Sequence, residues 1–176
     1  MNCGSEIGNA ADYKYRLSSM DIREQENRGI ILKSFIRDLH SEDIDRVTDL
    51  WLDCNIKAHA FIPAEYWIHN FDMVKSMLPL AEVYVYENEN MIYGFVGLNG
   101  EYIEGIFVSK ECQSCGIGTQ LLNHIKGIRN KLQLKVYQKN TCAVHFYLRK
   151  GFEILSEDVD EATGEKEYIM IWQPER

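Results

Sequence analysis

The sequence predicts an α/β protein, a three-layer sandwich in which a mixed sheet carries helices on both faces. Segments with strand-like and helix-like hydrophobic periodicity follow one another in the order β-α-α-β-β-β-α-β-α-β-β. The chain has 176 residues, 45% of them apolar, which is enough to bury one sizeable core. We therefore place one domain in residues 30–176. Residues 1–29 are polar and aperiodic, and we interpret them as an extension with the composition of a disordered segment.

The domain is expected to begin with a strand at residues 30–37, followed by two helices. Ser41 is a good N-cap residue for the first helix, which we expect to end near residue 57. Pro63 or Ala64 opens the second helix, which runs toward residue 77.

A hairpin comes next, with strands at residues 82–87 and 91–98 around a turn at residues 88–90. Another strand is expected at residues 102–108. The remaining elements are a helix at 119–128, a strand at 133–137, a helix that begins after Asn140 and ends at Gly151, and two strands at 152–158 and 165–172 joined by a turn at 162–164.

The turn between the strand at 102–108 and the helix that follows carries a Q-x-x-G-x-G motif. Its residues, with the first helical position after it, are Gln113, Ser114, Cys115, Gly116, Ile117, Gly118 and Thr119. The first N–H groups of a helix have no partner within the helix, and the helix dipole adds partial positive charge there. Glycines let a phosphate approach those amides, so the motif predicts an anion site; the alternative is a plain glycine turn that caps a helix.

A second motif begins at Asn140, where the strand at 133–137 gives way to a helix. It reads N-x-x-A-x-x-F-Y, with Ala143, Phe146 and Tyr147 at helical spacing, and Gly151-Phe152 follow it. An ordinary amphipathic helix with an aromatic core face would explain this segment by itself. It does not explain the order of these residues after a Q-x-x-G-x-G turn.

Together the two motifs resemble the GNAT superfamily of acetyl-CoA-dependent N-acetyltransferases, across about residues 32–173. The stretch from His59 to Tyr66 and the residues around Glu104 also resemble a small, uncharacterised bacterial subgroup of that superfamily. The resemblance implies a GNAT-like sheet that splays open after the strand at 102–108. It also implies acetyl-CoA as co-substrate, with its pyrophosphate on the turn at 113–119 and its pantetheine arm in the opening.

The resemblance further implies roles for single residues. Phe107 and Val108 would present backbone groups to the pantetheine arm, and Gly105 would mark the bulge where the splay begins. Tyr147 matches the residue that acts as general acid to the departing thiolate; the alternative is that it only packs against the arm. Glu104 is the candidate base, and a solvated strand carboxylate is the alternative. The residues on the cofactor side of the second motif are Asn140, Ala143 and Phe146.

The acceptor is expected to be a primary amine of a small molecule or a peptide. It would lie near His59 and Phe61, in the loop between the first two helices. His59 could be a base or a substrate contact, although a histidine in such a place is more often a capped loop residue. The alternative to an enzyme is a non-catalytic, acyl-CoA-binding regulator with the same fold. The presence of both Tyr147 and Glu104 favours the enzyme.

Composition narrows the remaining possibilities. The net charge of −8 argues against nucleic-acid binding, and no apolar run approaches membrane-spanning length. Five cysteines without regular spacing favour a cytoplasmic location, and we expect a monomer or homodimer. Cys112 and Cys115 form a C-x-x-C pair, but further zinc ligands at a recognisable spacing are missing, so we expect no metal and a structural or incidental role for the pair.

Overall fold

The computed structural model describes residues 34–174, so the extension predicted at residues 1–29 and the start of the first predicted strand lie outside the described residues. The described part holds one seven-stranded sheet in the order β1-β2-β3-β4-β5-β7-β6. Every neighbouring pair is antiparallel except β4 and β5, which are parallel. The strands are β1 (Phe35–Asp38), β2 (Glu82–Asn88), β3 (Met91–Asn99), β4 (Tyr102–Val108), β5 (Leu132–Tyr137), β6 (Glu153–Val159) and β7 (Lys166–Trp172).

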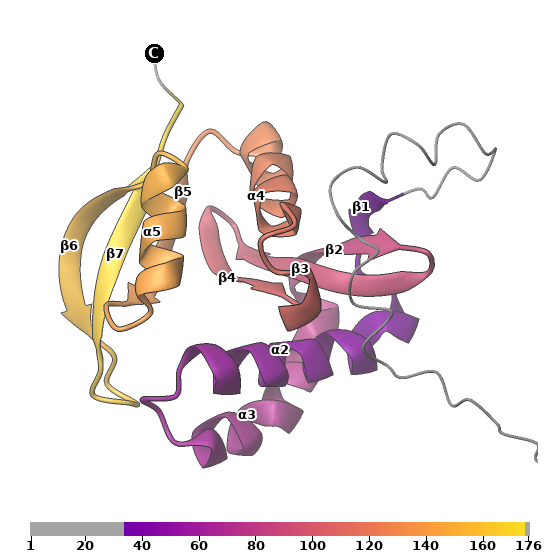
Figure 1. Ribbon diagram of the computed structural model, residues 1–176, viewed down its shortest axis with the longest axis horizontal. Helices are drawn as coiled ribbons and strands as arrows, with labels where there is room; N and C mark the ends of the chain where they lie inside the picture. The colour runs from indigo at the N-terminus through magenta and orange to yellow at the C-terminus, as the bar shows by residue number, and fades with distance from the viewer. Residues whose placement is uncertain (1–33, 175–176) are drawn as a thin grey trace, which may run out of the picture. The chain divides into compact units, whose positions relative to one another are not determined.

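Helices cover both faces of this sheet, as the sequence predicts (Figure 1). The helices are α2 (Ile44–Ala58), α3 (Ala64–Met77), α4 (Ile117–Ile128) and α5 (Thr141–Arg149), with short 3-10 turns at η3 (Ser41–Asp43), η4 (Leu78–Leu80) and η5 (Lys110–Cys112). The predicted order of helices and strands and the mixed three-layer sandwich are therefore confirmed. None of the helices in residues 34–174 is long and apolar enough to cross a membrane.

The two faces have separate cores. One core joins the sheet to α4 and α5 and includes Leu121 and Ile125, both fully buried. The other joins the sheet to α2 and includes Val47 and Leu50. Most of the periodic apolar positions of α4 fill the first core, although Ile128 at its end is exposed. Burial of apolar surface therefore holds α2 and α4 on opposite faces.

The start of the first helical segment differs from the prediction. His40, not Ser41, occupies the N-cap position, and a 3-10 turn precedes α2. The carboxylate of Asp43 accepts a hydrogen bond of 2.8 Å from the backbone N–H of His40, so the cap comes from inside the turn. Asp43 is buried and is held there by Arg37, whose Nη1 lies 2.6 Å from Oδ2 of Asp43. This tertiary contact decides where the turn begins.

Arg37 also lies 2.6 Å from the buried carboxylate of Glu87, so one guanidinium serves two carboxylates. Replacing Arg37 by methionine keeps the apolar stem but leaves both carboxylates without their partner. We expect a loss of about 3 kcal/mol in the free energy of unfolding at pH 7, the size typical of breaking a buried pair. Denaturant titration measures it, and Lys75→Met, which breaks an exposed pair with Asp45, should change stability little.

The hydrogen bond from Arg37 lowers the pKa of Asp43 below its ordinary value near 3.8. A carboxyl group whose pKa is lowered by folding stabilises the protein fully above its unfolded pKa and loses that contribution as the pH falls through the folded pKa. The stability gap between wild type and Arg37→Met should therefore narrow below about pH 4. The absence of a gap at pH 7, or a gap that stays constant as the pH falls below this value, would contradict this account of the cluster.

Candidate active site

The sheet opens between β4 and β5. The two strands are paired only at Tyr102 and Gln133, beyond which they diverge. A bulge in β4 precedes the opening: Gly97 pairs with Gly105 and Leu98 with Ile103, so Glu104 is the extra residue. A side chain at Gly105 would meet the ring of Phe107 at 2.5 Å, which explains the glycine at this position.

The register of β4 decides which of its backbone groups face the opening. Ser109 N–H donates to the carbonyl of Tyr93 at 2.8 Å, so Val108 and Gly94 form a non-hydrogen-bonded pair. The N–H and C=O groups of Val108 therefore point away from β3, toward the side where β5 has left. By the same alternation, those of Ile106 point there too.

Phe107 does not present its backbone groups to the opening, as had been expected for it. It stands opposite Phe95 at a position where the backbone groups turn toward β3, and its ring stacks on Phe95 with centroids 4.7 Å apart. Phe107 thus lines the wall of the opening with its side chain, while the unpaired backbone groups belong to Ile106 and Val108.

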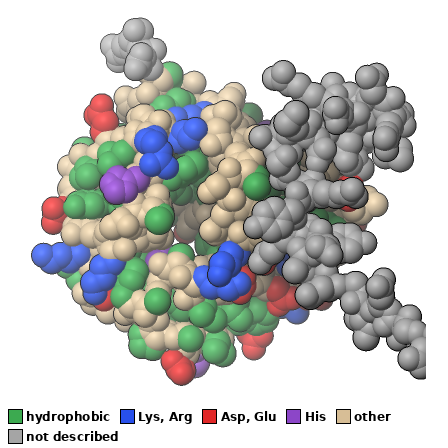
Figure 2. Space-filling view, viewed as in Figure 1, with side chains coloured by type: hydrophobic (Ala, Val, Ile, Leu, Met, Phe, Trp, Pro, Cys, Tyr) green, Lys and Arg blue, Asp and Glu red, His purple; other side chains and the backbone are tan. Residues whose placement is uncertain are grey.

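A cavity of about 990 Å³ runs from this opening along α4 and α5. Among the described residues, five cationic side chains line it against one carboxylate, Asp53, and Asp53 already bonds Lys57 at 2.5 Å. The cations are Lys57, Lys110, Lys139, Arg149 and Lys150. Figure 2 shows Lys and Arg side chains around a hollow on one face of the molecule. In a chain of net charge −8, this local excess of positive charge favours an anionic ligand.

The glycine-rich turn lies at one end of the cavity. Gly116 is the N-cap of α4 in the left-handed region, with φ of 87°, and no side chain of the described residues caps the helix. In the part of the chain that the structure describes, the first intrahelical bond of α4 is Gln120 N–H to the carbonyl of Gly116, at 3.0 Å. The amides of Ile117, Gly118 and Thr119 are thus available to a ligand at the positive end of the helix dipole.

Most of the residues predicted to bind the cofactor line this cavity: Phe107, Val108, Gln113, Gly118, Thr119, Asn140, Ala143 and Phe146. Cys115 and Gly116 are exposed and do not line it, and the side chain of Ile117 is buried in the core beside α4. Gln113 donates from Nε2 to the carbonyl of Val108 at 3.2 Å, so it ties the turn to the end of β4.

Asn140 caps α5, as predicted, and also contacts the loop between α2 and α3. Its Oδ1 accepts from the N–H of Ala143 at 3.2 Å, which directs its Nδ2 at Nε2 of His59, 3.1 Å away. His59 must then accept at Nε2 and is neutral, which fits the lowering of its pKa to about 4 by burial. A neutral histidine whose Nε2 is already used does not resemble a free base, and we assign His59 a positioning role.

Tyr147 lies on the face of α5 that turns toward the sheet and lines the cavity while being 7% exposed. Its ring packs against Phe146 and Phe152, with centroids 5.2 and 5.3 Å away. Burial raises the pKa of the Tyr147 phenol above its ordinary value near 10, so the hydroxyl keeps its proton at neutral pH.

The other two predicted site residues lie outside the cavity lining. Glu104, as the extra residue of the bulge, is exposed on the sheet. Phe61 packs edge-on against Tyr137, with ring centroids 5.7 Å apart, as does His59 at 5.1 Å. The loop between α2 and α3 therefore borders the end of β5, on the face of the sheet away from α5.

The C-x-x-C pair remains a pair of free thiols, with Cys115 exposed and Cys112 partly buried. Within residues 34–174, the structure contains no group of three or more His, Cys, Asp or Glu residues arranged to hold a metal ion.

Several residues of the site were not expected from the sequence. Cys54 of α2 lines the cavity and donates its S–H to the carbonyl of Val108 at 3.3 Å, and burial raises its pKa to about 11. Ile106 and the cationic side chains were missed as well. The cationic residues come from three separate stretches of the chain, so no local pattern marks them.

A splayed sheet, unpaired strand amides in the opening and a cationic cavity ending on a helix N-terminus define an acyltransferase of the acyl-CoA-using class. The sequence model of the acetyltransferase (GNAT) domain matches residues 79–154. The peptidyl-lysine N-acetyltransferase YiaC of Escherichia coli strain K12 is 31% identical over 139 residues, which cover 78% of this chain and 95% of YiaC. The chain belongs to the GNAT family and is an acetyl-CoA-dependent N-acetyltransferase.

One further relative agrees with this assignment, and two solved structures share the fold. Peptidyl-lysine N-acetyltransferase YjaB of the same organism is 31% identical over 120 residues, which cover 68% of this chain and 82% of YjaB. The solution structure of apo YjaB from Escherichia coli superimposes with a TM-score of 0.71 at 27% identity, over 79% of this chain and 97% of that one. The PaiA N-acetyltransferase of Thermoplasma acidophilum, solved with coenzyme A, shares the fold with a TM-score of 0.69 at 18% identity, over 81% and 99% of the two chains.

Proposed function

We propose that the protein transfers the acetyl group of acetyl-CoA to the side-chain amine of a lysine in a peptide or protein, by direct attack and with Tyr147 as general acid. The observation that carries the proposal is the convergence of three features on one cavity. These are the free amides at the start of α4, the backbone N–H of Val108 in the opening, and the hydroxyl-bearing face of α5. The names of the relatives YiaC and YjaB favour lysine as the acceptor.

The cavity suits acetyl-CoA along its whole length. The amides of Ile117, Gly118 and Thr119, with the cationic rim, would hold the pyrophosphate and neutralise its charge. The N–H and C=O groups of Ile106, which face the opening, would pair with the amides of the pantetheine arm as a strand would. Cys54 and Gln113 already occupy the carbonyl of Val108, so its N–H is the group left for the ligand.

Two groups of the protein would then assist the transfer of the acetyl group. The N–H of Val108 can donate to the thioester carbonyl and stabilise the negative charge that develops on its oxygen. As the new C–N bond forms and the C–S bond breaks, the departing thiolate takes a proton from Tyr147, and Tyr147 regains one from the acceptor nitrogen. The raised pKa keeps the phenol of Tyr147 protonated at neutral pH, so a proton is present to be donated. A thiol has a lower ordinary pKa, near ~8.5, so the donation depends on Tyr147 regaining the proton of the acceptor nitrogen in the same step.

Mass spectrometry of products tests this function directly. The protein should acetylate lysine-containing peptides in the presence of acetyl-CoA, with kcat/KM for a peptide exceeding that for free amino acids and polyamines. The same peptide with lysine replaced by norleucine, which has no amine, is the control. Acetylation of small amines alone would reject the peptide acceptor, and absence of transfer to every amine would favour the non-catalytic regulator.

A further inference from the structure

The outer face of β5 and β7, away from α5, carries a buried carboxylate that the reaction above does not use. Leu134 and Val136 of β5 belong to the core beside α4 and α5, so by alternation Tyr137 points to the other face. Glu167 of β7 stands directly opposite Tyr137 in the sheet and is 8% exposed. A carboxylate that is buried to this degree ordinarily has a close cationic partner.

Within residues 34–174, Glu167 shares its cationic partner with another carboxylate. Its one ion pair there is with Lys135, whose Nζ lies 3.4 Å from Oε2. The same ammonium lies closer to Asp158, at 2.8 Å, and therefore serves mainly that carboxylate. Burial raises the pKa of Glu167 above its ordinary value near 4.5, in spite of Lys135. Glu167 is thus a desolvated carboxylate that a second cation would stabilise.

The position of Glu167 along the strand direction can be compared with that of the opening between β4 and β5. β4 and β5 run parallel from the pair Tyr102 and Gln133, and each residue advances a strand by about 3.3 Å. Ile106 lies four residues after Tyr102, and Tyr137 lies four residues after Gln133. Glu104 is an extra residue of β4 in this stretch, so the two levels match to within about one residue. Glu167 itself lies on β7, the strand beyond β5 from the opening, and is not among the residues that line the cavity.

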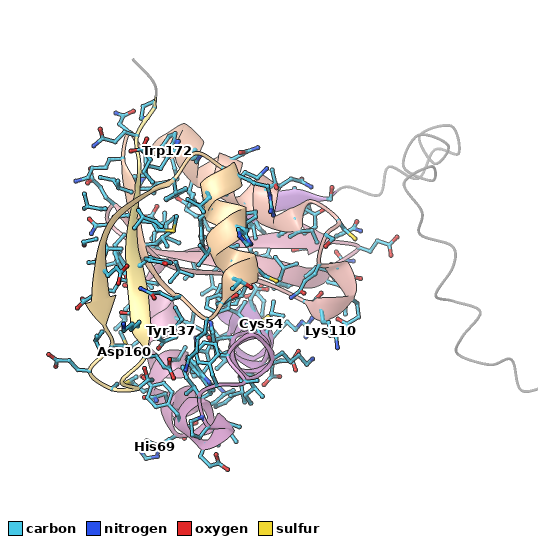
Figure 3. The ribbon with its side chains drawn as sticks, turned by 60° about the vertical axis from the view of Figure 1, so that its left-hand side comes forward. Cys54, His69, Lys110, Tyr137, Asp160 and Trp172 are labelled. Atoms are coloured by element: carbon cyan, nitrogen blue, oxygen red, sulfur yellow. The ribbon has the colours of Figure 1, made fainter. Side chains whose placement is uncertain are left out.

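Glu167 is surrounded by residues from two connecting segments of the chain. Tyr137 donates to Asp160 at 2.5 Å, and Figure 3 shows these two residues together where β5 ends and the turn between β6 and β7 begins. His59 and Phe61 pack on the ring of Tyr137. The loop between α2 and α3 and the turn between β6 and β7 thus flank Glu167, on the face opposite to Tyr147.

We propose that Glu167 binds the ammonium of the acceptor lysine and takes its proton, which makes it the general base of this enzyme. This rests on the proposed function of the cavity. The carboxylate of Glu167 receives one proton from the ammonium and leaves a neutral amine, which attacks the thioester carbonyl through the opening. The second proton leaves the nitrogen as the C–N bond forms and replaces the one that Tyr147 gives to the thiolate. The proton on Glu167 then passes to solvent.

This assignment moves the base from Glu104 to Glu167. Glu104 is exposed, so water already solvates its carboxylate and gains little from a substrate ammonium. Glu167 is desolvated and pairs across the sheet with Tyr137, on which His59 and Phe61 pack. An ion pair with a lysine that enters beside this loop would be stronger there than in water.

The charged and titratable groups around Glu167 determine which of them the pH dependence of kcat/KM reports. They are Lys135, Asp158, Asp160, Tyr66, Tyr102 and Tyr137. The pKa values of Lys135 and of the three tyrosines are raised above 10, and those of both aspartates are lowered below 3.8. His59, which packs on Tyr137, also borders this group, and burial lowers its pKa to about 4. Glu167 is the group here whose pKa is moved from the acidic range toward neutrality. The acidic limb of kcat/KM for the lysine acceptor should therefore report Glu167.

Glu167→Gln tests the proposal. We expect kcat/KM for the acceptor to fall by about 10²-fold or more, since a general base contributes that much. The affinity for acetyl-CoA, measured by calorimetry, should not change. The acidic limb should move from the pKa of Glu167 to that of the lysine, so the rate should rise with pH up to pH ~10.4. Glu157→Gln, an exposed carboxylate of β6 with the same change in charge, should behave as wild type.

Wild-type kcat/KM and an unchanged pH profile in Glu167→Gln would overturn the proposal. If that variant does not fold, Glu167→Asp keeps the base but moves it away, and an unchanged kcat/KM in it would also overturn the proposal. If the wild type acetylates small amines but no lysine peptide, the acceptor is wrong, yet the same loss in Glu167→Gln with those amines supports Glu167 as base. Absence of transfer to any amine would overturn both.

Discussion

Replacing Gly118 by aspartate should weaken acetyl-CoA binding by about 10²-fold or more, because like charges in contact across an interface cost several kcal/mol. Gly118 lies in the first turn of α4 and lines the cavity where its amide faces the expected pyrophosphate. A Cβ there would meet the ring of Phe146 at 3.7 Å and Val108 at 3.8 Å, which are ordinary contacts. An acidic residue near a helix N-terminus is also compatible with the helix dipole. The fold should therefore survive while binding is lost.

The same helix provides the control. Gly127 lies near the end of α4, where an added Cβ would meet nothing within 4 Å among the described residues, so Gly127→Asp makes the same change in charge away from the cavity. Calorimetry should give wild-type affinity for Gly127→Asp and a lost or much weakened signal for Gly118→Asp. Gly116 is a poorer test because its φ of 87° would strain any other residue. Equal affinities in both variants would move the pyrophosphate away from the start of α4.

Tyr147→Phe should lower kcat by about 10²-fold while leaving the affinity for acetyl-CoA nearly unchanged, if the hydroxyl protonates the departing thiolate. The phenylalanine keeps the ring that packs against Phe146 and Phe152, so the core beside α5 should not lose stability. The loss should appear with every acceptor amine, because the acid serves the donor. Steady-state kinetics with a lysine peptide and with a small amine, and calorimetry with acetyl-CoA, measure these effects.

A second substitution helps to distinguish a role of Tyr147 as general acid from a role in packing. Tyr137→Phe removes another hydroxyl with a raised pKa, but one that donates to Asp160 on the acceptor side. We expect its effect to appear mainly in KM for the acceptor. If Tyr147→Phe instead keeps its kcat and loses only affinity for acetyl-CoA, Tyr147 is a packing residue.

Much of the fold follows from patterns that are local in the sequence. β4 begins and ends at the predicted residues, and Asn140 and Gly151 bound α5 because each side chain or backbone angle is a local requirement. The start of the first helix could not be predicted in the same way. There the cap depends on Asp43, which Arg37 fixes from β1, and a contact between separate elements leaves no mark on the segment itself.

The residues of the site likewise fall into those that a local pattern predicts and those that depend on contacts between separate elements. The glycine turn and Asn140 are visible in the sequence because a helix N-terminus has fixed chemical needs at fixed positions. The unpaired groups of Ile106 and Val108 depend on the register of β4 against β3 and on the departure of β5. Glu167 follows Lys166 at the charged start of β7, and nothing in that sequence indicates that it is buried. Only the sheet pairing reveals that it is buried beside Tyr137.

The departure of β5 from β4 has a consequence for solubility. Strand amides without partners ordinarily invite another chain to add to the sheet, which makes exposed edges a source of aggregation. Here the unpaired groups of β4 lie inside the sheet, with β3 on one side and the β5-β7-β6 half on the other. Adding a polypeptide strand would require room for side chains on both faces, and α5 and the loop between α2 and α3 border that space. A slender molecule with amides but no side chains can enter, so the geometry that admits a pantetheine arm also keeps foreign strands out.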